Sequence, residues 1–535
     1  MVESAMTTRD DDGLREAPGC NEDGKRAAAT ASSTSRSDHD SQPPHRTLLH
    51  HAHVYLSIAI LFINYFLAQF DKFILSYFQP SVLSTLSIGA PQYALLTGYS
   101  TGIVNAILAL PVAMVADFTA ARVWTLCVAS AWWSLCVVFQ GLARTYAEMY
   151  CARLGMGIGQ SAVEALSVSL ISDFVGWRNA FLGSSVFYVG VYIGEAISGQ
   201  IATAFTSTNT SWQVAMRAIG ITGIVVAVIM RLVLREPKRR SSLYRKDADE
   251  SCDPAEDVGE QIALNAHGRP KILPLIFKTV VYLVRMRCFW LILLSAGARQ
   301  LGGVVFGYYM PGYLSSIYPE QTDLLSKYGI IVGTVGSVSV LSGGLLTSLL
   351  WHKTKLTPLY LTAIGGMLSS VFVLLMVFSR DIAGDNGPRG KSILYGTMAV
   401  AYATAEMWLG CVNAFVALLL PPRTKTFGLA IWTCVQVLIY SSGPEIIGLA
   451  LRDVEPGTDE YARDTQVALA VIIPTGYWLC AVGMLSAIPL VRRDLDGDFV
   501  RGPLSWRRKT GFGTVVGVLA AMVIVLFTLS IVYSV

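Results

Sequence analysis

The strongest constraint in this sequence is a succession of apolar segments, each about 20 residues or longer and able to cross a bilayer as a helix. Six segments come first, a polar stretch follows at 235–284, and six more segments precede a final apolar run, GTVVGVLAAMVIVLFTLSIVYSV. The expected spans are 54–78, 92–115, 122–142, 146–173, 178–205, 212–234, 286–317, 326–350, 356–379, 391–420, 425–451, 466–490 and 513–535. Backbone groups in lipid must bond within the chain, so such segments fold as helices. The sequence predicts an all-α polytopic membrane protein.

Composition agrees with this class and excludes others. Hydrophobic residues make up 53% of the chain and charged residues 15%, whereas soluble proteins carry about 25% charged residues. The net charge of +4 is small for 535 residues, so no nucleic-acid partner is expected. The nine cysteines are scattered without a CxxC pair, which indicates small core residues with no metal or redox role. The sequence has no metal-ligand set, nucleophile elbow or phosphate-binding glycine loop, so we expect neither a cofactor nor an enzyme.

The chain divides into five parts by composition. Residues 1–50 are rich in Ser, Thr, Asp, Arg and His and have no apolar run, so we expect a disordered tail. The other expected parts are an N-terminal six-helix bundle at 51–234, an inter-bundle loop at 235–284, a C-terminal six-helix bundle at 285–495, and a basic linker with an extra transmembrane helix at 496–535. Lys and Arg gather in the loops that follow even-numbered spans. This bias predicts a cytoplasmic N-terminus and cytoplasmic 1–50 and 235–284 segments, with the thirteenth helix ending on the opposite side.

Ionisable residues inside the spans follow a period of three helices. A charge at the bilayer centre costs several kcal/mol, so such residues mark functional or paired sites. The first helix of each consecutive triplet carries them: Asp71 and Lys72, Arg153 and Glu164, Arg299, and Glu406. Spans 5 and 11, which are equivalent in the two halves, carry Glu195 and Glu445. Repeats of three helices within each half are typical of secondary transporters that bind their substrate between the halves.

Helical geometry gathers these residues into polar stripes. Residues at i, i+4, i+7 and i+11 share a helix face. Such stripes contain Asn64 and Asp71 in span 1, Arg153, Gln160 and Glu164 in span 4, Tyr188, Tyr192 and Glu195 in span 5, and Glu406 and Asn413 in span 10. The set favours a shared aqueous path through the membrane. The alternative for any single residue is structural pairing between helices, for example between Arg153 and Asp71.

Two regions carry a resemblance to a known family. RLGMGIGQSAVEALSVSLISDF in span 4 and LLPPRTKTFGLAIWTCVQVLIYSSGPEIIGLALRD around span 11 resemble the Spinster-like branch of the major facilitator superfamily. The matching positions in span 4 are Arg153, Gly157, Gly159 and Asp173, and FDKF in span 1 matches the family's Asp-Arg pair with Lys in place of Arg. The resemblance covers roughly 54–495. It implies a major facilitator fold of two six-helix bundles, to which the thirteenth helix is an addition.

The sequence departs from the family pattern at two places. Gln160 occupies the position of the family's helix-4 glutamate, which is implicated in proton coupling, and Glu164 lies one turn later on the same face. MVADFTAARV between spans 2 and 3 is a worn version of the superfamily motif Gly-x-x-x-Asp-Arg-x-Gly-Arg. Asp117 and Arg122 remain of this motif and are expected to gate one conformation.

The resemblance implies a symporter or antiporter that moves an amphipathic lipid, such as a lysophospholipid or a sphingoid lipid, across an endolysosomal or plasma membrane. Protons are the expected coupling partner, with Asp71 and Glu164 as their sites. The expected substrate contacts and cavity-lining residues are Lys72, Asn64, Arg153, Gln160, Tyr188, Tyr192, Glu195, Arg299, Glu406, Asn413 and Tyr440. Two alternatives stay open: a carrier of the same fold for a small organic anion, and a receptor-like or channel-like protein that no longer transports.

Overall fold

The computed structural model describes residues 44–119, 121–161, 163–208, 210–237, 272–318, 323–384, 387–420, 425–455, 458–495 and 506–533. These residues form helices and connecting turns, and none of them forms a strand. Residues up to 53 and from 54 onward form two separate units, and the second unit holds the helical bundles. The expected disordered tail at 1–50 lies outside the described residues as far as 43, while 44–50 already belong to the first helix, α2.

Thirteen helical segments of the described chain are long and apolar enough to cross a membrane. They cover 52–77, 90–117, 122–140, 146–175, 179–205, 212–233, 287–317, 324–350, 357–377, 387–419, 425–450, 459–495 and 510–532. Each corresponds to one predicted span and differs from it mainly at the ends. The prediction of an all-α polytopic membrane protein is therefore confirmed.

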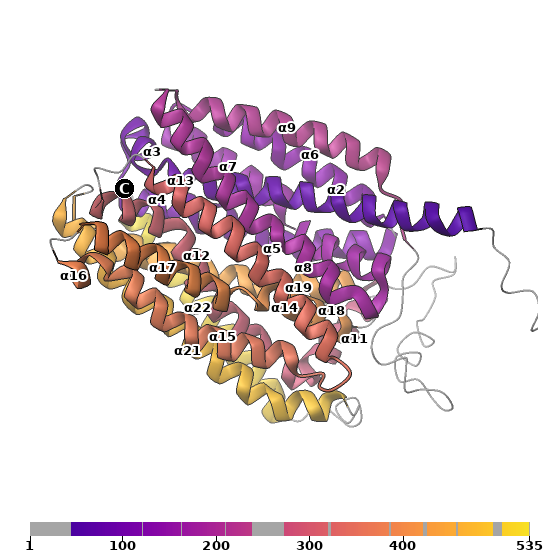
Figure 1. Cartoon of the computed structure of the whole chain (residues 1–535). Helices are drawn as coiled ribbons and strands as arrows, with labels where there is room; N and C mark the ends of the chain where they lie inside the picture. The colour runs from indigo at the N-terminus through magenta and orange to yellow at the C-terminus, as the bar shows by residue number, and fades with distance from the viewer. Residues whose placement is uncertain are drawn as a thin grey trace, which may run out of the picture. The chain divides into compact units, whose positions relative to one another are not determined.

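The N-terminal half comprises the first six spans (Figure 1). Its helices are α2 (Pro44–Tyr77), α3 (Gln79–Leu86), α4 (Ala90–Thr97), α5 (Tyr99–Thr119), α6 (Arg122–Gln140), α7 (Tyr146–Gln160), α8 (Val163–Ser207) and α9 (Trp212–Val233). Helix α8 carries the end of span 4 and all of span 5.

The C-terminal half comprises spans 7 to 12. Its helices are α12 (Arg287–Ile317), α13 (Leu324–Ile331), the π-helix η2 (Val332–Gly336), α14 (Ser337–Leu350), α15 (Thr357–Val377), α16 (Ser379–Ala383), α17 (Gly387–Ala405), α18 (Trp408–Leu419), α19 (Lys425–Tyr440), α20 (Ser442–Ala450) and α21 (Asp459–Leu495).

The expectation of a loop throughout 235–284 is wrong for its last part. Helix α11 (Ile272–Arg285) occupies this stretch with the sequence ILPLIFKTVVYLVR. Phe277 on this helix is 70% exposed, whereas Thr279 and Leu283 are buried. An exposed aromatic ring opposite a buried face is typical of a short helix that lies along the membrane surface, and the 14 residues of α11 are fewer than the roughly 20 of a membrane span.

Small residues bring the helices of each half into close contact. A Cβ atom on Gly159 of α7 would lie 2.6 Å from Trp133 Cβ of α6, and one on Gly220 of α9 would lie 2.7 Å from the Ser134 carbonyl oxygen. Glycine at these positions lets the backbones approach, which is how membrane helices associate without a hydrophobic driving force. Between the halves, α8 packs against α14 and α18, and α5 packs against α19.

In four spans of the described chain a turn separates two helical segments, and η2 divides span 8. The breaks lie at Gly98 between α4 and α5, at Ser161 after α7, at Glu406 and Met407 between α17 and α18, and at Ser441 between α19 and α20. A broken helix frees backbone groups, and these are tolerated at membrane depth only inside protein or beside a water-filled cavity. Such discontinuous helices surround the midplane sites of many transporters.

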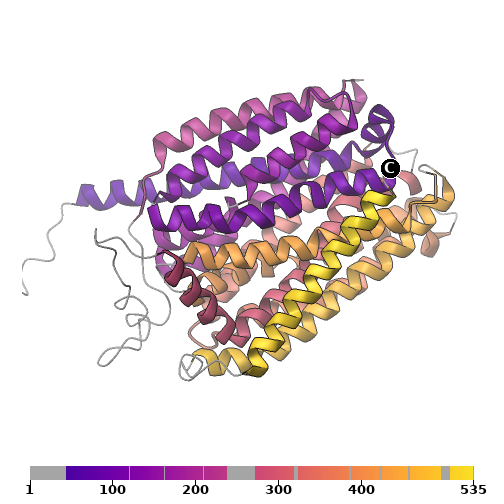
Figure 2. The same cartoon turned by 180° about the vertical axis from the view of Figure 1, so that it is seen from behind.

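The thirteenth helix, α22 (Trp506–Val532), crosses the C-terminal half obliquely, as Figure 2 shows in bright yellow. It contacts α20 of the C-terminal half and α4 of the N-terminal half. Ser530 of α22 donates a hydrogen bond to Glu445 of α20, and Phe527 packs edge-on against Tyr99 at 6.0 Å between ring centroids. Helix α22 therefore bridges the seam between the two halves.

Candidate functional site

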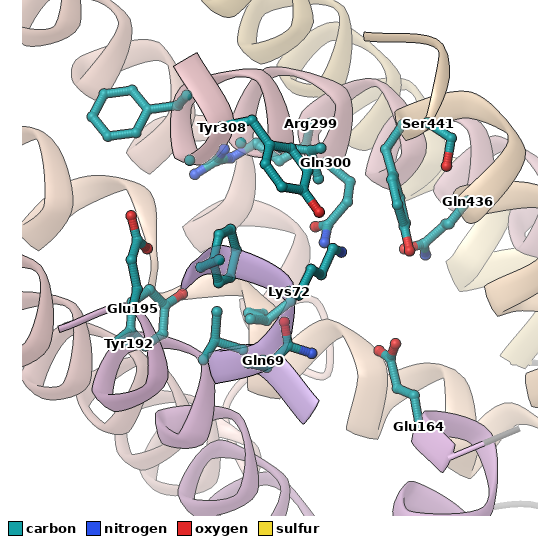
Figure 3. Close-up of a pocket in the computed structure, with 18 of the residues that line it drawn as sticks. Gln69, Lys72, Glu164, Tyr192, Glu195, Arg299, Gln300, Tyr308, Gln436 and Ser441 are labelled. Carbon is teal, nitrogen blue, oxygen red and sulfur yellow. The ribbon is translucent and has the colours of Figure 1, made fainter. Parts of the chain in front are cut away.

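A cavity lies between the two halves, and the helix breaks border it. Gly98, Gln160, Glu406 and Ser441, which stand at or next to the four breaks, all line its wall. Aromatic rings, amides and charged groups share this wall with small apolar residues. Figure 3 shows Lys72 reaching into the space, with Glu164, Glu195 and Arg299 around it.

The structure brings several predicted site residues together in this wall. These are Lys72, Gln160, Glu164, Tyr192, Glu195, Arg299, Glu406 and Tyr440, and they come from spans 1, 4, 5, 7, 10 and 11. Spans 1, 4, 7 and 10 are the four that begin the helix triplets. Their interior charges therefore point toward the centre of the molecule, away from the lipid-facing surface.

Four residues expected to line the cavity do not. Asn64 is 1% exposed, Arg153 and Tyr188 are fully buried, and Asn413 accepts a hydrogen bond from the Trp432 indole at 2.8 Å. A polar stripe predicts one face of a helix, and that face runs the whole length of a span. Asn64 and Asn413 each stand seven residues, about 10 Å, from the charged residue of their stripe, so they lie beyond the cavity and are buried within the bundle.

Asp71 lies behind the cavity wall rather than in it. It is 1% exposed, and neither of its carboxylate oxygens has a hydrogen-bond partner among the described residues. Arg153 faces it from span 4, fully buried, with three guanidinium nitrogens likewise unpartnered. Their side chains do not form an ion pair within 4 Å. The pairing of these two residues considered from the sequence is therefore absent from this conformation.

Lys72 is the cation that the cavity leaves available. Its ammonium lies 4.8 Å from the centroid of the Tyr440 ring, a cation–π distance. Glu164 faces it across the cavity, but no described residue forms an ion pair with Lys72 within 4 Å. Figure 3 shows the Gln300 side chain extending toward Lys72. An ammonium group set among amides and aromatic faces, with no ion-pair partner in the described chain, is suited to receive an anion.

Glu164 is held by a phenol. The Tyr188 hydroxyl donates to its carboxylate at 2.6 Å, and Tyr188 itself packs edge-on against Tyr65 and Phe187. The buried tyrosine therefore positions Glu164 from behind while its carboxylate faces the cavity.

Arg299, the second cation of the wall, is already neutralised. It donates to Glu406 at 3.1 Å and to the Ala405 carbonyl oxygen at 3.0 Å, and its guanidinium lies 3.7 Å from the centroid of the Tyr477 ring. The helix break after Ala405 leaves that carbonyl free to accept. Tyr192 of the N-terminal half donates to the other oxygen of Glu406 at 2.7 Å, so this cluster also connects the two halves.

A network of ions joins the two halves toward one end of the cavity, which we call the Asp173 end. Asp173 accepts from Arg122 at 2.7 Å and from Lys425 of the other half at 3.1 Å. Glu236 contacts Arg122 at 2.7 Å, and Asp117 accepts from the Phe427 backbone N–H at 2.9 Å. The two residues retained from the worn loop motif, Asp117 and Arg122, therefore lie where the halves meet.

Sequence reasoning missed several residues of the site. The amides Gln69, Gln300 and Gln436 line the cavity, and Lys425 joins the Asp173 network. Uncharged amides carry no charge and so were not singled out by a survey of ionisable residues, and Lys425 resembles an ordinary loop cation because it directly follows PPRT. No group of three or more His, Cys, Asp or Glu residues in the described chain is arranged to hold a metal ion.

Comparison with known proteins identifies the family. A model of the Major Facilitator Superfamily matches residues 61–444. The chain belongs to the major facilitator superfamily. Solved structures of this superfamily share its fold: a bacterial homologue of the human lysosomal transporter Spinster, inward-facing and unoccupied, gives a TM-score of 0.58 at 17% identity and covers 87% of this chain and 100% of its own. The proton:xylose symporter XylE gives 0.58 at 14% identity, covering 83% and 96%.

Two curated sequences resemble this major facilitator chain over part of its length. The probable L-galactonate transporter of Escherichia coli is 25% identical over 252 residues, which is 46% of this chain and 51% of that protein. The sphingosine-1-phosphate transporter SPNS2 of Danio rerio is 22% identical over 253 residues, 45% and 46% respectively. The chain thus spans about half the length of the curated relatives it matches. Spinster proteins stand among its neighbours in both sequence and structure, as the span 4 and span 11 motifs indicate.

Proposed function

We propose that this protein is a proton-linked secondary transporter of an organic anion that works by alternating access. The observation that carries the proposal is Lys72, a cavity cation without an ion pair in the described chain. Each remaining charged group of the wall has its own partner or faces Lys72: Arg299 is paired with Glu406, Glu195 accepts from Tyr328, and Glu164 is bonded to Tyr188.

The position of Glu164 supports linkage to protons. It faces Lys72, so an anion bound to the ammonium lies close to this carboxylate. Two like charges about 4 Å apart repel by about 4 kcal/mol at an effective dielectric constant near 20. Protonation of Glu164 removes this repulsion, so anion and proton bind together and cross together. This is the arrangement of a symporter.

Asp71 is proposed as a second protonatable group. It is adjacent to Lys72 in the chain and faces Arg153 within a fully buried environment. Separation of the halves would admit water to this pair and change the cost of its charges. Asp71 thereby senses the conformation rather than the substrate, and Arg153 is its alternating partner.

The cavity wall favours a small hydroxylated acid as the substrate. Four glutamines, Gln69, Gln160, Gln300 and Gln436, line it together with Asn105, Thr101 and Thr433. Amide and hydroxyl groups bond to the hydroxyls of a polar solute, and the many aromatic faces cover its apolar edges. A relative named as a galactonate transporter agrees with this substrate class.

An amphipathic lipid with an anionic head group is the second candidate. The span 4 and span 11 motifs, the likeness to the SPNS2 sequence and the Spinster homologue fold support it. In that case the head group lies at Lys72, and the acyl chain needs an apolar path between helices.

Uptake into proteoliposomes under an imposed pH gradient tests the proposal. Labelled galactonate and labelled sphingosine 1-phosphate serve as the two probes, each with the other as competitor. We expect gradient-driven accumulation of one of them, its loss in Lys72→Gln, and partial retention in Lys72→Arg, which keeps the charge. Glu164→Gln is expected to bind the anion but to lose its dependence on the gradient.

Three results contradict the proposal. If neither probe accumulates, an organic anion is not the substrate class. If Lys72→Gln transports as well as the parent protein, Lys72 is not the contact of the anion. Full gradient-driven accumulation in Asp71→Asn removes the proton role of Asp71. Accumulation of the lipid alone selects the second candidate over the first.

A further inference from the structure

Two buried glutamates lie on equivalent helices of the two halves, toward the end of the cavity opposite to Asp173. Glu195 of span 5 accepts a hydrogen bond from the Tyr328 hydroxyl of span 8 at 3.2 Å. Glu445 of span 11 accepts one from the Tyr99 backbone N–H of span 2 at 3.2 Å. Each bond joins the N-terminal half to the C-terminal half. We call this the Glu445 end.

The two contacts are related by the internal symmetry of the fold. Spans 5 and 11 are equivalent helices of the two halves, and so are spans 8 and 2, because each half has six spans. The seam between spans 5 and 8 and the seam between spans 11 and 2 are thus the same interface repeated. Each seam carries one glutamate, at the same end of the cavity, bonded to a group across it.

Neither glutamate has a cation beside it. Glu195 is 4% exposed and Glu445 is fully buried, and neither forms an ion pair with a described residue. The titratable groups that face Glu195 are Tyr77, Tyr192, Tyr328, Tyr402 and Glu406. Those that face Glu445 are Tyr99, Tyr146, Tyr150 and Tyr309.

The chemistry of these surroundings accommodates a neutral carboxyl group. An ionised carboxylate buried without a cation is costly, and phenols or a backbone N–H compensate only part of that cost. Ser530 of α22 adds a further hydrogen bond at Glu445. A protonated carboxyl retains these bonds without the charge, whereas an ionised one is stabilised by water, which enters when the seams separate.

We infer that Glu195 and Glu445 are a symmetric pair of proton-binding sites that keep the Glu445 end closed while both are protonated. This inference extends the proposed function, in which Glu164 and Asp71 bind protons, by adding two sites that act on the gate. Loss of their protons opens this end at both seams together, because each half moves as one body.

The hydrogen-bonded pair of Gln200 in span 5 and Ser326 in span 8 provides a place to measure whether the seam is closed or open. Their hydrogen bonds join the same seam five residues beyond Glu195, at 2.9 and 2.8 Å. In Gln200→Cys/Ser326→Cys, a short bifunctional thiol reagent is expected to cross-link the halves at acidic pH. The cross-link is expected to be lost at alkaline pH, when the seam opens. The single-cysteine variants measure the background from native cysteines.

A second pair corrects for the reactivity of thiols, which itself changes with pH. Gln466 of α21 donates to Asp381 of α16 at 2.6 Å, at the same end but within the C-terminal half. Asp381→Cys/Gln466→Cys is therefore expected to stay cross-linked at every pH at which thiols react.

The glutamine variants test the role of the two carboxyls. Glu195→Gln and Glu445→Gln imitate the protonated form, so each is expected to retain much of the Gln200–Ser326 cross-link at alkaline pH, and the two together nearly all of it. Glu460→Gln, an exposed acid at the same end, is expected to follow the parent. Infrared spectra of the purified protein without substrate are expected to lose protonated-carboxyl carbonyl absorption in each glutamine variant but not in Glu460→Gln.

Two results overturn the inference: a Gln200–Ser326 cross-link that ignores pH in the parent, or glutamine variants that keep the parent's pH profile. If the variants do not fold, the protonated-carboxyl infrared band and the Gln200–Ser326 cross-link of the parent are titrated together. A band that persists at a pH where the cross-link is already lost also contradicts the inference. If the protein does not take up the anion but its Gln200–Ser326 cross-link still depends on pH, only the proposed function is rejected and the inference stands.

Discussion

Arg299 lies almost fully buried in α12, where its guanidinium touches three different groups. Glu406 neutralises its charge, the Ala405 carbonyl accepts a hydrogen bond, and the Tyr477 ring covers one face. The sequence predicts both Arg299 and Glu406 as interior charges but not their pairing, because a helical wheel gives directions within one helix and no distances between helices.

The Arg299–Glu406 pair leads to a stability prediction. Glu406→Gln leaves the guanidinium without its counter-charge, so we expect a loss of about 3–5 kcal/mol of stability. The double variant Arg299→Gln/Glu406→Gln is expected to lose less than Glu406→Gln alone, since neither charge remains. Thermal unfolding of the purified protein in detergent measures both. A double variant that melts below the single one would show that Tyr477 stacking, and not charge balance, dominates.

At the scale of helices, the sequence predicts the spans well and their interruptions poorly. About 20 apolar residues are a physical requirement of the bilayer, so the thirteen spans stand out from composition alone. A break at Gly98 or Ser441 is a local change of backbone path that depends on what packs beside it, and the flanking residues keep their apolar pattern. Helix α11 was not predicted because its 14 residues are too few to cross the bilayer.

Some tightly packed glycines lie between helices of the same half, and others lie between helices of different halves, so substitutions at the two kinds of position should have different effects. A Cβ atom at Gly410 of α18 would lie 2.5 Å from Ser185 Cα of α8, across the seam, whereas one at Gly220 meets Ser134 within the N-terminal half. We expect Gly220→Ala to destabilise the fold by about 1–3 kcal/mol. Gly410→Ala is expected to push the halves apart and to reduce uptake more than it lowers the melting temperature.

Gly396 of α17 provides the matched control, because a Cβ atom there meets nothing within 4 Å. Gly396→Ala is expected to gain up to about 1 kcal/mol from helix propensity. Melting temperature and uptake are measured for the three variants side by side. Equal effects of Gly220→Ala and Gly410→Ala on both quantities would contradict the distinction.

At the scale of the whole molecule, the two halves are in contact at both ends of the cavity. The period of three helices in the charged residues predicts the halves and the position of the site between them. It does not predict which ends are closed, because closure depends on pairs such as Asp173 with Lys425 that form only in some arrangements of the halves.

Breaking the Asp173 end should shift that arrangement. Lys425 and Asp173 are almost fully buried, with side chains 4% and 2% exposed, so Lys425→Gln removes a cation from a buried carboxylate and breaks its ion pair between the halves. We expect a cysteine at Thr426, which is buried in the parent, to react much faster with a polar maleimide in this variant. The exposed pair Lys327–Asp323 is the control, because surface pairs contribute about 0–1 kcal/mol. Equal labelling in Lys425→Gln and Lys327→Gln would refute the role of the network.

The wide π turn at Val332–Gly336 divides span 8 into two pieces, with Tyr328 on one side and the α14 residues that pack on α8 on the other. A turn of this kind holds one residue more than an α turn, and converting it to regular helix rotates one piece against the other by about 100°. Such a conversion would turn α13, which carries Tyr328, relative to α14, in addition to the movement of the two halves as bodies. One end of span 8 would then rotate about the helix axis, and the whole helix would not have to slide along its neighbour.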